Sequence, residues 1–175
     1  MLLERLANPS TLRKMREDIE GNEAQDWENP VRGSGYDGIM VASTSSHNFE
    51  GRTLSQLAEE LGTEPFDAMV TVLRAERLRV SMVEFAMAEA DVETIMANEW
   101  TMIASDGLPV GNGGKPHPRL HGTFPRVLGH YVRDRGVLDL GTAIRKMTGL
   151  PAEVFGIPGR GRIAAGAVAD LVAFS

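Results

Sequence analysis

Three short apolar runs, separated by segments of helical spacing, constrain the fold of this chain more than any other feature. They cover residues 37–43, 79–85 and 100–105. The first run is bounded by Gly and by Ser-Thr and is apolar almost throughout, which is typical of a strand buried on both faces of a parallel sheet. Because strands alternate with helices along the chain, the sequence predicts an α/β fold with a parallel sheet.

Capping residues and apolar spacing predict the helices around these strands. They are expected at residues 2–6, 11–20 with Ser10 as cap, 54–61 with Thr53 as cap, 65–73, 88–98, 124–133, and 140–147 with Asp139 as cap. Residues 21–35 are predicted to be a long connection, and residues 149–156 a turn. The tail, residues 159–175, is predicted to form two short strands around a Gly turn that need a partner sheet.

Composition narrows the class of protein. A chain of 175 residues with 42% hydrophobic residues can build a core, so disorder is excluded as a class. The net charge of -6, with Lys and Arg interspersed among acids, argues against a nucleic-acid partner. No apolar stretch has the length of a membrane span, and we expect a soluble, cytoplasmic protein without a membrane partner. The absence of Cys excludes disulfides and thiolate ligands in this chain.

Asp106 ends the third apolar run and precedes Gly107. Asp-Gly is a common tight-turn pair, so a plain turn is one interpretation. Residues 108–120 are too many and too rich in Gly and Pro for a hairpin connection, which favours a functional loop. Catalytic groups collect where parallel strands end at the carboxyl edge of a sheet. Asp106 is therefore the first catalytic candidate.

The other candidates for chemistry are weaker. The His residues are His47, His117, His121 and His130. None of the four forms a spacing that brings two imidazoles to one metal, except His117 and His121, which are four residues apart. Because these two flank Pro118 in or beside the Gly- and Pro-rich loop, surface loop positions explain them better than metal binding. Ser43 and Thr44 end the first strand and could line a pocket, although structural polar ends are the simpler interpretation.

The architecture predicted from this chain is incomplete. A closed eight-stranded barrel needs roughly 250 residues, whereas only three strands here support a parallel arrangement. We therefore expect the chain to be a piece of a larger enzyme. The edge of the strand at residues 37–43 would then lack a partner, and exposed strand edges favour association. The isolated chain is accordingly predicted to oligomerise, to aggregate or to need a partner.

Several motifs resemble a known family in the order in which they occur. They are Ala104-Ser-Asp-Gly-Leu-Pro, His117-Pro-Arg, Gly122-Thr-Phe-Pro-Arg-Val-Leu-Gly-His-Tyr-Val, and Ala143-Ile-Arg-Lys-Met-Thr-Gly-Leu-Pro-Ala. Together they resemble the C-terminal part of the N-acyl-D-amino-acid deacylases, or D-aminoacylases, of the amidohydrolase superfamily. Residues 161–174 resemble the segment by which amidohydrolases return from the barrel to a small β-sandwich. The resemblance implies a barrel portion at residues 1–158 and a return segment at residues 159–175.

The resemblance also implies an activity. The family has a distorted (β/α)8 TIM-type barrel with zinc at its carboxyl end and hydrolyses the amide bond of N-acyl-D-amino acids. Asp106 matches the acid that takes a proton from the zinc-bound water and hands it to the leaving amine. Arg119, in His-Pro-Arg, matches the residue that binds the substrate carboxylate, for which a guanidinium fork is suited. The family's metal ligands lie in its N-terminal half, so this chain holds none beyond Asp106.

Three hypotheses follow for the function. The first is a portion of a zinc-dependent D-aminoacylase that acts on a small-molecule substrate and is inactive without the missing N-terminal half. The second is a truncated, non-catalytic descendant that survives as a binding or assembly module. The third is a hydrolase with its own metal arrangement built from His47, His117 or His121 together with Asp106.

Overall fold

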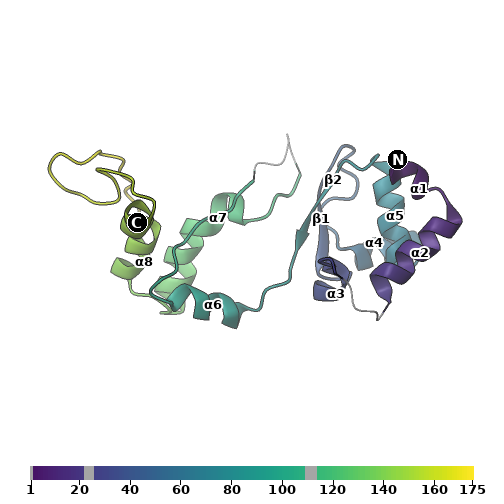
Figure 1. Cartoon of the computed structure of the whole chain (residues 1–175), viewed down its shortest axis with the longest axis horizontal. Helices are drawn as coiled ribbons and strands as arrows, with labels where there is room; N and C mark the ends of the chain where they lie inside the picture. Colours follow the sequence, from purple (N-terminus) through teal and green to yellow (C-terminus); the bar gives the residue numbers. More distant parts are fainter. Residues whose placement is uncertain (1, 22–25, 109–113) are drawn as a thin grey trace. The chain divides into compact units, whose positions relative to one another are not determined.

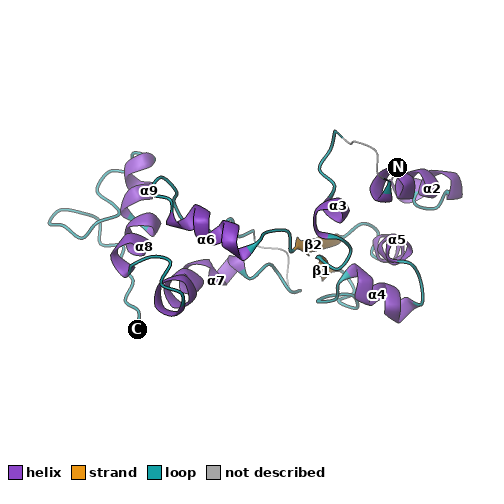
Figure 2. Ribbon diagram, turned by 90° about the horizontal axis from the view of Figure 1, so that it is seen from below, coloured by secondary structure: helices purple, strands orange, loops and turns teal. Residues whose placement is uncertain are grey.

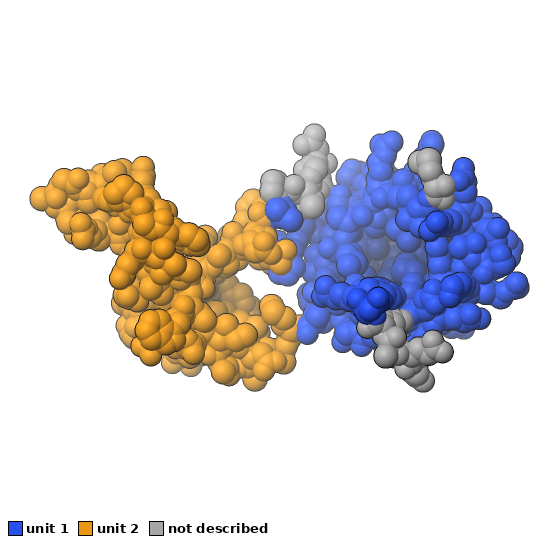
Figure 3. All heavy atoms as spheres, in the orientation of Figure 1, with its two compact units in different colours: residues 1–86, 108–117 blue, residues 87–107, 118–175 orange. Residues whose placement is uncertain are grey.

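The computed structural model describes residues 2–21, 26–108 and 114–175. The chain divides into two compact units (Figure 3). Unit 1 comprises residues 1–86 and 108–117, and unit 2 comprises residues 87–107 and 118–175. No helix of the described part of the chain has the length and apolar character needed to cross a membrane.

Unit 1 contains a two-stranded sheet formed by β1 (Ile39–Thr44) and β2 (Val80–Glu84), which lie side by side (Figure 1). Both strands were expected from the sequence, but the pair is antiparallel, with Ile39 opposite Glu84 and Thr44 opposite Val80. The predicted parallel sheet is therefore wrong for the described residues. An apolar run indicates that a strand is buried, and it carries no information on the direction of its neighbour.

A β-bulge at Ala42 shapes the carboxyl end of β1. The ladder shifts between Val41 and Ser43, so that Ala42 is an extra residue on this strand. The Ala42 carbonyl accepts a hydrogen bond of 2.6 Å from the backbone N–H of Lys115. On β1, Val41 also exchanges backbone hydrogen bonds with Gly51 and Arg52. The edge of β1 that was predicted to be unpaired therefore makes backbone contacts within the chain at residues 40–42.

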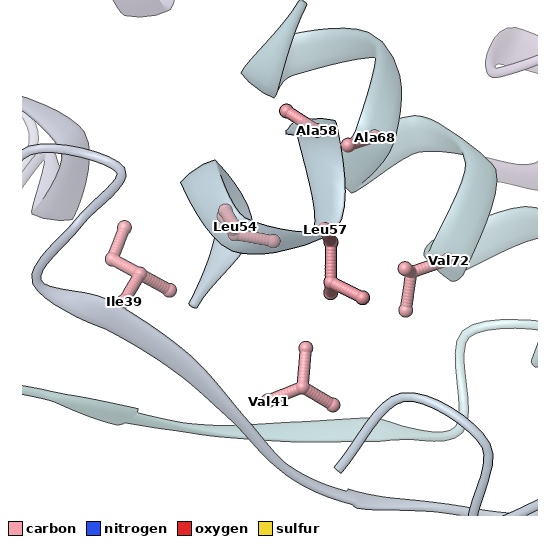
Figure 4. Packing of buried hydrophobic residues seen from close by; sticks show 7 residues of the cluster. All are labelled: Ile39, Val41, Leu54, Leu57, Ala58, Ala68 and Val72. Carbon is pink, nitrogen blue, oxygen red and sulfur yellow. The ribbon is translucent and has the colours of Figure 1, made fainter. Parts of the chain in front are cut away.

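The core of unit 1 forms between β1 and two helices, α4 (Leu54–Leu61) and α5 (Pro65–Ala75). Figure 4 shows the side chains of this cluster pointing toward one another from the strand and both helices. Leu57 and Val72 are 1% exposed. Burial of each such side chain contributes about 1.5–3 kcal/mol. The predicted start of α4 is confirmed, because Thr53 and Gln56 form a reciprocal capping box.

The N-terminal helices differ in detail from the prediction. The helix α1 (Leu2–Arg5) precedes α2 (Pro9–Glu20), which is capped by Asn8 rather than by Ser10. The Asn8 side chain accepts from the N–H groups at residues 10 and 11. Pro occupies the first helical position, where its missing N–H costs nothing. The connection predicted at residues 21–35 contains a short helix, α3 (Pro30–Ser34), which Asn29 caps in the same way.

The loop that follows β1 is held by two carboxylates. Glu76 is 5% exposed and accepts hydrogen bonds from the Ser46 backbone N–H, at 3.1 Å, and from the Ser46 hydroxyl. Glu50 accepts from the backbone N–H of Thr44 at 2.8 Å and lies 2.9 Å from His47 Nδ1. These contacts satisfy backbone donors that would otherwise be unpaired at the end of the strand.

The regular secondary structure of the described part of unit 2 is helical. It contains α6 (Glu89–Ala97), α7 (Arg119–Arg126), a π-helix η1 (Val127–Asp134), α8 (Leu140–Met147) and α9 (Gly149–Val154). Figure 2 shows helices and loops but no strand among the described residues of this unit. Its core joins Val127, Tyr131, Leu138 and Ala143 from three successive segments. The predicted cap of α8 at Asp139 is confirmed, since its carboxylate accepts from the Thr142 N–H.

Three predictions for unit 2 are wrong. Residues 100–105 pair with no strand of the described part of the chain. The predicted turn after α8 contains α9, and residues 159–175 form turns and irregular segments rather than two strands. The first and third errors share a physical cause, because strand-like sequence forms a ladder only where a second strand is available. The predicted helix at 124–133 is longer and begins at Arg119. The α-helix gives way to a π-helix at Val127, two residues after Pro125, which lacks a backbone donor.

Candidate functional site

The structure brings Asp106 and Arg119 together within unit 2. Arg119 Nη2 lies 3.1 Å from Asp106 Oδ2. The side chains are 41% exposed for Arg119 and 76% for Asp106, and ion pairs of such exposure stabilise a fold by at most about 1 kcal/mol. The pair therefore leaves both charged groups accessible to a small molecule, and it contributes little to stability.

The backbone at Asp106 has an uncommon conformation. Asp106 has φ of 46°, in the left-handed region, which Asp tolerates better than most residues. The Ser105 hydroxyl accepts a hydrogen bond of 3.3 Å from the Gly107 N–H. Neither Asp106 nor Gly107 lies in a regular turn, so the interpretation of Asp-Gly as a plain tight turn is not confirmed. The left-handed backbone at Asp106 is accompanied by the ion pair of its carboxylate with Arg119.

Gly107 allows this approach. A Cβ placed on Gly107 would lie 3.0 Å from Leu120 Cα and 3.2 Å from Leu120 Cδ1. Since Leu120 is the second residue of α7, the chain after Asp106 packs directly against the start of the helix that carries Arg119. The 13-residue separation of the acid and the guanidinium in sequence is closed at this contact.

The His residues have contacts of other kinds within their own units. His47 pairs with Glu50 in unit 1, and His130 lies on η1, with its ring edge against Tyr131 and Nε2 3.6 Å from Glu89. Within residues 2–21, 26–108 and 114–175, no group of three or more His, Asp or Glu side chains could hold a metal ion. The hypothesis of a metal site made from His47, His117 or His121 with Asp106 is not supported by this arrangement.

The polar residues at the end of β1 have structural roles. Thr44 is 4% exposed, and its hydroxyl accepts a hydrogen bond of 3.1 Å from the His47 backbone N–H. Ser43 is half-buried and lies opposite Ser81 in the ladder. The geometry of Thr44 fits the interpretation of these residues as polar strand ends.

A second polar cluster was not singled out from the sequence. Glu89 at the start of α6 pairs with Arg126 at 3.1 Å, and the Arg126 guanidinium lies 5.3 Å from the centre of the Tyr131 ring. The Tyr131 hydroxyl, followed by the charge of Arg126, lowers the pKa of Glu89, and burial raises the pKa of Tyr131. Arg126 and His130 are four residues apart and so share a helix face, which was the available signal. The cluster ties α6 to η1.

Comparison with protein families places the chain among known sequences. Residues 10–175 match the family model described as the amidohydrolase family. The chain is 50% identical to a D-aminoacylase of Alcaligenes xylosoxydans xylosoxydans over 124 residues, which are 71% of this chain and 24% of that protein. It is 43% identical to an N-acyl-D-glutamate deacylase of the same organism over 147 residues, 83% of this chain and 28% of that protein. The chain thus spans about a quarter of the length of these relatives.

Solved structures give a consistent result. The crystal structure of N-acyl-D-glutamate deacylase from Bordetella bronchiseptica, in complex with zinc and a phosphonate mimic of the tetrahedral intermediate, matches 92% of this chain and 35% of its own. The TM-score is 0.68 and the sequence identity 34%. A D-aminoacylase structure concerned with a binuclear metal centre matches 75% of this chain and 27% of its own, with a TM-score of 0.64 and 42% identity.

Proposed function

We propose, from the premise that this chain belongs to the amidohydrolase family and to its D-aminoacylase group, that it supplies an acid and an arginine to an enzyme that hydrolyses the amide bond of N-acyl-D-amino acids. The observation that carries the proposal is the solvent-accessible pair of Asp106 and Arg119. These two residues stand in the motifs that resemble the family's catalytic acid and carboxylate-binding residue.

Asp106 is assigned the proton transfers. Amide hydrolysis needs a base that takes a proton from the attacking water and an acid that gives one to the departing nitrogen. A single carboxylate can do both in turn, if it lies within about 3 Å of each atom. Its exposed position meets the requirement of access.

Arg119 is assigned the substrate's carboxylate. Every N-acyl-amino acid carries an α-carboxylate, and the planar guanidinium can bind one through two parallel hydrogen bonds. Because the ion pair with Asp106 is exposed and weak, a substrate carboxylate can bind the same guanidinium at small cost. Arg119 would then hold the substrate beside the acid that moves its protons.

Zinc enters the proposal through the relatives alone. The described residues of this chain do not build a metal site by themselves. We propose that the metal ligands and the rest of a TIM-type barrel come from additional polypeptide, and that the activity requires it. The proposed proton transfers of Asp106, from the water and to the departing nitrogen, use no metal geometry.

The experiment measures deacylation of N-acyl-D-amino acids and zinc content, for this chain and for the chain joined to the polypeptide encoded upstream. In the joined protein, Asp106→Asn should lower kcat by about a hundredfold or more, the usual contribution of a positioned acid–base group. Arg119→Gln should raise KM by about tenfold, since it removes a charge-assisted hydrogen bond to the substrate.

The matched controls are Asp134→Asn and Arg133→Gln. These residues form another exposed Arg–Asp ion pair, at 2.8 Å, in the same unit. Both control variants should retain wild-type rates. A joined protein that binds zinc but does not deacylate any N-acyl-D-amino acid would sink the proposal and favour a non-catalytic binding or assembly module.

A further inference from the structure

Lys146 on α8 is a buried cation that the proposed chemistry does not use. The residue is 2% exposed. Its ammonium donates to the backbone carbonyls of Asn98 and Thr101, the latter at 2.9 Å, and to the Thr101 hydroxyl at 3.3 Å. An ammonium has three N–H donors, so these contacts satisfy it completely. All of its acceptors belong to the segment between α6 and Asp106.

The backbone of Lys146 holds the same segment. Its carbonyl accepts a hydrogen bond of 3.2 Å from the Ile103 N–H. The Thr101 hydroxyl in turn donates to the carbonyls of Ile95 and Asn98, which ties the segment to the end of α6. Among the residues that the structure describes, no strand pairs with residues 98–103, so these hydrogen bonds take the place that a sheet ladder would have.

The chemistry of the contact indicates a specific role. Burial, together with the charge of neighbouring Arg145, lowers the pKa of Lys146, which shows that its surroundings disfavour the charge. A buried cation held by neutral oxygens is seldom the most stable choice at a core position, and an apolar side chain of similar size packs at lower cost. A gain in the stability of the fold therefore does not explain the ammonium of Lys146 at this position, whereas a role in orienting residues 98–103 does.

We propose that Lys146 is a positioning residue for Asp106. The inference rests on the proposed function, in which Asp106 carries the protons. Ile103 is fixed by Lys146 on one side, and Gly107 is fixed against Leu120 on the other. Only residues 104–106 lie between these two anchors, so the first anchor limits where the Asp106 carboxylate can stand. Small displacements of a reacting group lower rates strongly.

The test uses Lys146→Met in the joined, active protein, because Met has a similar length and no donors. Hydrogen–deuterium exchange should rise in peptides covering residues 98–107 and stay unchanged in those covering β1 and β2. Binding of a phosphonate inhibitor counts the folded molecules. The value of kcat per folded molecule should fall by about tenfold. KM should stay within about twofold, because Arg119 is held by α7 and not by Lys146.

Two further variants keep the test decisive. Lys14→Met, at an exposed lysine of α2, is the control and should change neither exchange nor kcat. If Lys146→Met does not fold, Thr101→Val removes one acceptor with little change in shape and should give the same local exchange with a smaller loss of kcat. An unchanged kcat, or exchange that rises throughout the chain, would overturn the inference. Absence of deacylation by the wild type would instead sink the proposed function on which it rests.

Discussion

Gly107 packs against the backbone of Leu120, so closely that a methyl group at residue 107 would stand 3.0 Å from Leu120 Cα. This contact joins the end of the segment that carries Asp106 to the first turn of the helix that carries Arg119. The relative position of the two charged groups therefore depends on the absence of a side chain at one residue.

The first prediction concerns this contact. Gly107→Ala should lower kcat of the joined protein by about tenfold, because the added methyl group must push α7 or the segment that carries Asp106 away and displace Asp106 from Arg119. Steady-state kinetics measure the effect. Gly122→Ala, in α7, is the control, since a Cβ on Gly122 meets nothing within 4 Å. Equal rates for both variants would contradict the role of Gly107.

The second prediction concerns the buried carboxylate of Glu76. Glu76→Gln should lower the free energy of unfolding by about 1–3 kcal/mol. The two carboxylate oxygens of Glu76 accept from the Ser46 N–H and from the Ser46 hydroxyl, whereas the Gln amide has only one oxygen that can accept. Urea unfolding measures the change, with the exposed Glu59→Gln as control. A double-mutant cycle with Ser46→Ala should give a coupling above about 0.5 kcal/mol. Additive effects of the two substitutions would show that the contact does not stabilise the loop.

The third prediction concerns pH. The Thr44 N–H, followed by His47, holds the pKa of Glu50 below its usual value. In the unfolded chain the pKa of a Glu carboxyl group is about 4.3. A carboxyl group whose pKa is lower in the folded chain stabilises the fold fully above about pH 5. This contribution is lost as the pH falls through the folded pKa. Glu50→Gln should therefore lower the stability at pH 7 and weaken its decline below about pH 5. Chemical unfolding at several pH values, again with Glu59→Gln beside it, measures this, and parallel pH profiles for wild type and Glu50→Gln would refute it.

The fourth prediction concerns the tail. Ile163 is 91% exposed and Val172 85%, and Leu171 and Phe174 are also exposed in the same segment. Apolar groups gathered on an exposed segment favour association. The isolated chain should self-associate, and the double substitution Ile163→Ser with Val172→Ser should reduce the mean mass measured by light scattering. Ala167→Ser serves as the control. A wild-type chain that remains monomeric at high concentration would end this expectation.

Local features of the fold were predictable from the sequence where the signal itself is local. The caps at Thr53 and Asp139 bond to residues three positions later, and both are found where they are predicted. The cap of α2 lies two residues before the predicted one, because Asn8 and Ser10 are both good capping residues and Pro9 favours the first helical position.

Features that depend on a distant partner could not be predicted in the same way. The segment at residues 100–105 has the composition of a strand, yet no second strand lies beside it among the described residues. The direction of β1 relative to β2 depends on how the two helices between them cross the sheet, which the apolar pattern of either strand does not record. Strand identity was therefore accessible for β1 and β2, and sheet topology was not.

The candidate site shows the same division. Asp106 and Arg119 were named from motifs, one by one, but their contact across 13 residues depends on the packing of Gly107 and was not foreseen. The burial of Lys146 is not expected from its charge. Lys146 stands three residues after Ala143, and residues three apart share a helix face, so its burial was available as a signal.

The connection between Asp106 and Arg119 determines how changes in its length would be tolerated. Residues 108–117 belong to unit 1, where Lys115 bonds to the bulge at Ala42, whereas Gly107 and Pro118 belong to unit 2. The contact between Gly107 and Leu120 closes this connection, and doubling the length of a closed loop costs only about 0.6 kcal/mol. A longer or shorter connection is therefore compatible with the same placement of the acid beside the guanidinium.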